Sequence, residues 1–108
     1  MTTSQMIQMY KIKKAFIDKL SEALEISSTT VKSVDYEVYQ KELDQDTTYF
    51  EELIIVTFVG GAISVSSANG NSDSANFKEI ARLIDGGYYD EVRFYENLLN
   101  EGYVKVDL

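Results

Sequence analysis

Three strand-like segments follow one another between residues 31 and 65, and the links between them are too short to hold a helix. Residues 31–43 alternate between apolar and polar side chains with period two, as in a half-buried strand. Residues 49–59 contain the run Leu-Ile-Ile-Val, which predicts a central strand. Because parallel neighbours need a long crossover connection, the three segments predict an antiparallel meander.

The second and third segments are separated by Gly60 and Gly61. Both glycines can adopt a positive φ, so this pair predicts a two-residue hairpin link. The chain would then return through Ile63 and Val65 as the third strand. Residues 66–76 are rich in Ser, Asn and Asp and are predicted to form a loop.

Helical periodicity flanks the meander on both sides. Within residues 5–25, apolar residues recur at intervals of three and four with lysines between them, which predicts an amphipathic helix. The expected buried stripe of this helix is Met9, Ile12, Phe16, Leu20 and Ala23.

Two further helices are predicted after the meander. Asn76 and Glu79 fit a capping box at the start of one helix, and Gly86 would end that helix in the left-handed conformation. Asp90 is the predicted N-cap of the last helix, which ends near Gly102. Its expected buried stripe is Val92, Tyr95 and Leu99, with Phe94 and Leu98 beside it.

The predicted fold class is therefore α+β, in one domain covering residues 1–108. A three-stranded antiparallel sheet is packed with one N-terminal and two C-terminal helices. A short C-terminal edge strand around residues 103–106 would complete the sheet. All helices are expected on the apolar face of the sheet, giving two layers.

The chain contains no cysteine, histidine or tryptophan. This composition removes disulfides, thiolate and imidazole metal sites, and every nucleophile that depends on a histidine base. Asp44 and Asp46 resemble the start of a calcium loop, but Tyr49 and Ile55 stand where that loop needs glycine and glutamate. We therefore expect no enzymatic activity, no cofactor and no metal site.

The first apolar residues are interrupted by glutamine and followed by lysines. They form neither a signal-peptide core nor a membrane span, so a cytoplasmic protein is expected.

The charge is strongly acidic overall and uneven along the chain. Ten basic residues stand against 18 acidic ones, a net charge of -8. Residues 35–52 hold seven carboxylates against one lysine, and residues 85–101 hold five against one arginine. Such a field repels nucleic acid and anionic lipid and attracts a basic partner, although net negative charge also serves solubility alone.

Tyr88, Tyr89, Asp90 and Glu91 are consecutive. Either the aromatic rings seal a hydrophobic core while the acids open a helix, or the four residues form an exposed patch for a partner. Two adjacent loop tyrosines do not readily point into the same core, and tyrosine is a preferred interface anchor. The lysine-rich first helix leaves another alternative open, which is binding of nucleic acid or of an acidic subunit through its basic side chains.

Short pieces of the sequence resemble the small acidic phage anti-CRISPR proteins, of the kind carried by Listeria prophages, that inhibit the type II-A effector nuclease by DNA mimicry. The matching pieces are Leu53, Ile54 and Ile55; Ile63 and Ser64; and Tyr88, Asp90, Glu91, Phe94 and Tyr95. The resemblance implies a helix, a three-stranded antiparallel sheet and two helices in that order. It also implies a protein encoded by a phage or prophage, which acts in the cytoplasm of the bacterial host.

By this resemblance, Tyr88, Asp90 and Glu91 contact the nuclease surface that otherwise binds the PAM-bearing duplex. PAM reading uses arginines that donate bidentate hydrogen bonds, and carboxylates accept such bonds. The family carries an acidic tip on its sheet hairpin, whereas the corresponding residues 59–62 are uncharged. Asp44 and Asp46 are expected to compensate.

The full set of predicted partner-binding residues is Tyr88, Tyr89, Asp90, Glu91, Asp44, Asp46 and Asp85. The expected partner is a basic protein, first of all a guide-RNA-loaded CRISPR effector nuclease. The alternative is an acidic immunity or antitoxin protein that neutralises a basic nuclease-type toxin. No direct binding to nucleic acid or to a membrane is expected, and a monomer is favoured.

Overall fold

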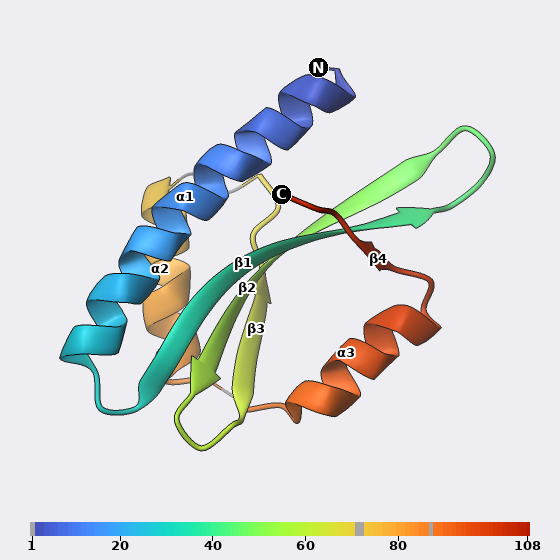
Figure 1. The fold of residues 1–108 in the computed structure, drawn as a ribbon. Coiled ribbons are helices and arrows are strands. Elements are labelled where there is room, and N and C mark those ends of the chain that lie inside the picture. Colours follow the sequence, from blue (N-terminus) through green and yellow to red (C-terminus); the bar gives the residue numbers. More distant parts are fainter. Residues whose placement is uncertain (1, 71–72, 87) are drawn as a thin grey trace.

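A computed structural model describes residues 2–70, 73–86 and 88–108 of the protein, and it has the α+β architecture shown in Figure 1. The elements are α1 (Thr3–Ser27), β1 (Val31–Glu42), β2 (Thr48–Phe58), β3 (Ile63–Ser67), α2 (Asp73–Ile84), α3 (Glu91–Asn100) and β4 (Val104–Lys105). The strands form one antiparallel sheet in the order β3-β2-β1-β4. The predicted α+β class and meander are confirmed, and β4 provides the edge strand.

The helices lie on both faces of the sheet, so the prediction of two layers is wrong. Helices α1 and α2 cover one face, where Tyr36, Val38 and Ile54 are buried. Helix α3 covers the other face, where Tyr39 and Ile55 belong to a second core cluster. Three layers form because the long strands β1 and β2 carry apolar side chains on both faces, and neither apolar face is left to water.

Helix α1 forms as predicted, but its buried stripe differs from the expected one. Its buried residues are Tyr10, Lys13, Ile17 and Ser21. Ile12 is 60% exposed, and Ala23 is also exposed. The apolar residues of α1 spread over more than one side of the helix, and the side that faces the sheet includes a lysine with a buried partner.

The predicted stripe of α3 is also partly wrong. Val92 and Leu99 are 67% and 70% exposed, whereas Phe94, Tyr95 and Leu98 pack against the sheet. Asp90 is the N-cap of α3, as predicted, and its side chain accepts a hydrogen bond from the amide of Arg93.

The β2–β3 link and its glycines differ from the two-residue hairpin predicted. Residues 59–62 join β2 to β3. Within this link the Phe58 amide donates to the Ala62 carbonyl, so three residues lie between this hydrogen-bonded pair. Gly61 adopts a φ of 95°, while Gly60 does not have a positive φ. A turn followed by one left-handed glycine is the common geometry for a link of this length.

Helix α2 begins at Asp73, so the loop predicted over residues 66–76 is shorter than expected and Asn76 is not an N-cap. Gly86 does not adopt the expected positive φ. Glycine suits this position because a Cβ would lie 3.3 Å from the Arg82 carbonyl oxygen and 3.4 Å from Ser64 Oγ. In the part of the chain that the structure describes, no helix has both the length and the apolar content to cross a membrane.

Candidate functional site

Five of the seven predicted binding residues lie in one segment at the end of the sheet where β2 and β3 are joined (Figure 1). We call the described residues of this segment, 85, 86 and 88–91, the corner. The amide of Tyr89 donates to the carbonyl of Ile63 over 2.7 Å, and the amide of Ile63 donates back over 3.1 Å. This isolated bridge fixes the corner against the edge of β3.

The two tyrosine rings of the corner rest on the protein without entering its core. The Tyr88 ring meets the Phe58 ring edge to face, with 4.8 Å between centroids, yet Tyr88 is 61% exposed. The Tyr89 ring lies 6.4 Å from the Phe94 ring, and Tyr89 is 55% exposed. Each ring therefore has one supported flank and a large area in contact with water.

The carboxylates of the corner surround the start of α3. Asp90 Oδ1 accepts the Arg93 amide over 2.9 Å, which caps the helix. Glu91 stands in the first helical turn, where a negative charge is favourable. Both side chains, and that of Asp85 after α2, are exposed. Asp90 thus has a structural task, but its charge is not needed for that task, because a neutral asparagine also caps helices.

Asp44 and Asp46 lie in the turn between β1 and β2, far from the corner. Strand β2 separates this turn from Phe58, which contacts Tyr88, so the two sites are about 30 Å apart at 3.3 Å per residue. The seven predicted residues therefore do not form one continuous patch.

Asp44 has a local role in its turn. Its carboxylate accepts a hydrogen bond from the Asp46 amide over 2.9 Å. The pKa of Asp44 is lowered by this hydrogen bond and by a further one from Thr47.

A shallow uncharged depression adjoins the corner at Tyr88. It is lined by Thr29, Thr30, Phe58, Val59, Gly60, Ala62 and Tyr88. Val59 is 66% exposed at the tip of the β2–β3 link. The corner therefore presents exposed rings between carboxylates on one side and a neutral surface on the other. Such a surface can accept hydrogen bonds from cationic side chains, but it offers no nucleophile with a base.

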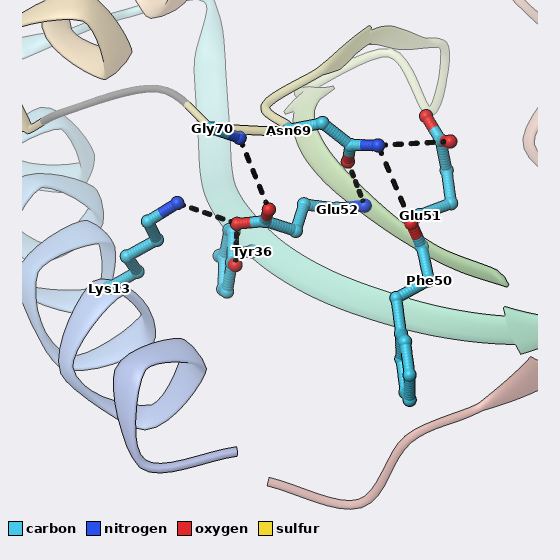
Figure 2. Close-up of polar contacts among 7 residues, drawn as sticks. All are labelled: Lys13, Tyr36, Phe50, Glu51, Glu52, Asn69 and Gly70. Atoms are coloured by element: carbon cyan, nitrogen blue, oxygen red, sulfur yellow. Dashed lines mark hydrogen bonds and ion pairs between the residues drawn. The ribbon is translucent and has the colours of Figure 1, made fainter. Parts of the chain in front are cut away.

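Sequence reasoning missed a buried ionic cluster between α1 and the sheet (Figure 2). Lys13 Nζ lies 2.7 Å from Glu52 Oε1, and their side chains are only 10% and 7% exposed. The Tyr36 hydroxyl donates to the same oxygen over 2.5 Å, and its pKa is raised by burial and by the Glu52 carboxylate. The Gly70 amide donates to Glu52 Oε2, so the cluster also contacts the chain that follows β3. The signal in the sequence was a glutamate directly before the apolar run Leu-Ile-Ile-Val of β2.

A second cluster ties α3 to the face of the sheet that is opposite to α1. Glu37 Oε2 accepts the Tyr95 hydroxyl over 2.7 Å, while Lys105 Nζ lies 3.1 Å from Oε1. The Tyr39 hydroxyl donates to Oε1 over 3.3 Å. Burial and the Glu37 carboxylate raise the pKa of both tyrosines. This cluster holds α3, and with it the carboxyl-terminal side of the corner, against the sheet.

No metal-binding group of three or more Asp, Glu, His or Cys side chains occurs among residues 2–70, 73–86 and 88–108. The chain matches no protein-family model, no curated protein and no solved structure among those with which it was compared.

Proposed function

We propose that this protein is a non-enzymatic inhibitor that binds a guide-RNA-loaded CRISPR effector nuclease and blocks its PAM-duplex site. The observation that carries the proposal is the exposure of two adjacent tyrosine rings beside three carboxylates at the corner. Large aromatic rings held on a rigid support are typical anchors of protein interfaces. The resemblance to the small acidic anti-CRISPR proteins supports the choice of partner.

The chemistry of the corner suits an arginine-lined cleft. The carboxylates of Asp90 and Glu91 can accept the bidentate hydrogen bonds that arginines otherwise donate to guanine. The face of an exposed tyrosine ring can also hold a guanidinium group. In binding the same donors, the protein would compete directly with the duplex.

The charge of the α3 layer supports the same mode of binding. Residues 85–108 contain six carboxylates and two basic residues. This negative field would accelerate encounter with a basic cleft, and the acceleration would decrease with salt. Asp44 and Asp46, about 30 Å away, would reach a second basic site of the nuclease. This distance corresponds to about nine base-pair steps of the duplex that the protein would replace.

Competition with the duplex tests the proposal. A guide-loaded type II effector is immobilised and exposed to the protein, with and without a PAM-bearing duplex. We expect capture without the duplex and loss of capture when the duplex is bound first. Capture that is unaffected by the duplex would contradict mimicry. Absence of capture, combined with binding to a basic nuclease-type toxin, would favour the immunity-protein alternative.

A further inference from the structure

Helix α1 has an outer face that no other element of the described chain covers. Buried residues of α1 face the sheet, and exposed residues occupy the opposite side. Four of these exposed residues follow one another at spacings of four, three and four: Ala15, Lys19, Glu22 and Ile26. This spacing places them in one line along the helix. Ile26, at one end of the line, is 88% exposed.

An apolar groove lies between α1 and α2, and Ala23 of this groove is one helical turn before Ile26. Helix α1 packs on β1, whereas α2 packs on β2 and β3. The groove between the helices is lined only by apolar residues, among them Leu20, Ala23, Phe77 and Ala81. Phe77 is 56% exposed and Ile12, which precedes the line of four, is 60% exposed. Exposed apolar side chains therefore occur both in the groove and on the outer face of α1.

The order of charges along the line selects the occupant. When a second α1 lies antiparallel across the first, Lys19 faces Glu22 of the partner subunit, and Ala15 faces Ile26 of the partner subunit. Twofold symmetry produces each contact twice. A parallel arrangement would instead set lysine against lysine and glutamate against glutamate. The surface is thus complementary to itself in the antiparallel orientation alone.

Both charged residues are available for this contact. The ion pairs formed within residues 2–70, 73–86 and 88–108 are Lys13 with Glu52, Lys14 with Asp18, Arg82 with Glu79 and Lys105 with Glu37. Lys19 and Glu22 are in none of them. We propose that a second copy of this chain docks on the outer face of α1 and forms an antiparallel homodimer.

The dimer would be weak, and it would leave the corner free. The line from Ala15 to Ile26 is about 17 Å long at 1.5 Å per residue, which corresponds to a small, transient interface. Helix α3 lies on the other side of the sheet from α1 (Figure 1). Dimerisation and binding through the corner therefore use separate surfaces, and each proposal can fail without the other.

Sedimentation equilibrium over a wide concentration range, at 0.15 M salt, tests the dimer. We expect the mass to rise from 12.2 kDa toward twice that value as the concentration increases. Lys19→Glu should weaken the association about tenfold or more, because it replaces two attractive contacts with two repulsive ones. Glu22→Lys should weaken it as much, and the combined Lys19→Glu and Glu22→Lys variant should restore it.

Two controls keep the test decisive. Lys32→Glu makes the same change in charge at an exposed residue of β1 and should leave the association unchanged. Thermal unfolding checks that each variant is folded. A further variant, Ile26→Asp, disrupts the outer face of α1 without altering Lys19 or Glu22. A wild-type protein that stays monomeric throughout, or a double variant that fails to restore association, would overturn the proposal.

Discussion

The two faces of the sheet each bury one glutamate, but they do so in different ways. On the α1 face, Glu52 is paired with a lysine whose side chain is 10% exposed. On the α3 face, the lysine that pairs with Glu37 is 62% exposed. The α1 face is thus a closed ionic cluster, whereas the α3 face has its ion pair open to solvent. We therefore expect that breaking the closed cluster destabilises the fold more than breaking the open one.

Breaking the closed cluster should have the largest effect. Lys13→Met leaves the Glu52 carboxylate buried without its cation, which typically costs 3–5 kcal/mol of the free energy of unfolding, as a rough expectation. The combined Lys13→Met and Glu52→Met variant should recover most of this loss, because it removes both charges together. Urea unfolding measures both variants. If the single variant lost under about 1 kcal/mol, the pair would have no such role.

Removing the ring of Tyr88 should affect binding far more than folding. Tyr88→Ala should weaken binding to the nuclease by about 2 kcal/mol or more, as expected for an interface anchor. Its contact with Phe58 is only partly buried, so the free energy of unfolding should fall by no more than about 1 kcal/mol. Tyr103→Ala removes a tyrosine ring outside the corner and serves as the control; because Tyr103 packs against the core, its free energy of unfolding is measured as well. Equal loss of binding in both variants would argue against the corner as the binding site.

The tyrosine hydroxyls allow the two glutamate clusters to be compared directly. Tyr36→Phe and Tyr95→Phe each remove one hydrogen bond to a carboxylate. We expect the loss to be about 2 kcal/mol for Tyr36, in the closed cluster, and about 1 kcal/mol for Tyr95, near solvent. Chemical denaturation of both variants gives the two values. The reverse order would mean that the α3 face contributes more to fixing the fold.

The smallest effect concerns Asp35, an exposed residue of β1 beside the α3 layer. Loss of hydration and the nearby Glu37 raise its pKa in the folded state. The folded protein therefore holds the carboxyl proton of Asp35 more tightly than the unfolded chain does. The contribution of Asp35 to stability declines as the pH rises from its pKa in the unfolded chain through its pKa in the folded protein. Asp35→Asn should increase the free energy of unfolding slightly at pH 7 and have no effect near pH 3. A gain of the same size at both pH values would rule out this cause.

The parts of the fold that depend on local sequence were predictable. Period-two alternation over residues 31–43 and the apolar run of β2 identified strands, and Asp90 was recognised as a cap because its role involves only its near neighbours. The buried face of α1 was not predictable in this way. Lys13 is buried because of Glu52, a residue 39 positions later that only the folded chain brings near.

Only part of the candidate site could be predicted, again because local sequence reveals only what lies close together in the chain. The residues of the corner are contiguous in the sequence, so their proximity required no knowledge of the fold. Whether Asp44 and Asp46 lie near the corner depends on the direction of β2. This strand carries the chain about 30 Å from one group of residues to the other. The side of the sheet taken by α3 depends on which strand face offers apolar contacts, and this follows from the packing of both β1 and β2.

The central claim is that the charges of the corner bind the partner and are separable from the fold. It is tested most directly by the affinity of an Asp90→Asn and Glu91→Gln double variant for the guide-loaded nuclease, with Glu25→Gln on α1 as the control. Asparagine retains the helix cap, so the melting temperature should hardly change. We expect binding to weaken about tenfold or more, since two charge-assisted contacts are lost. Unchanged affinity at unchanged stability would contradict the claim.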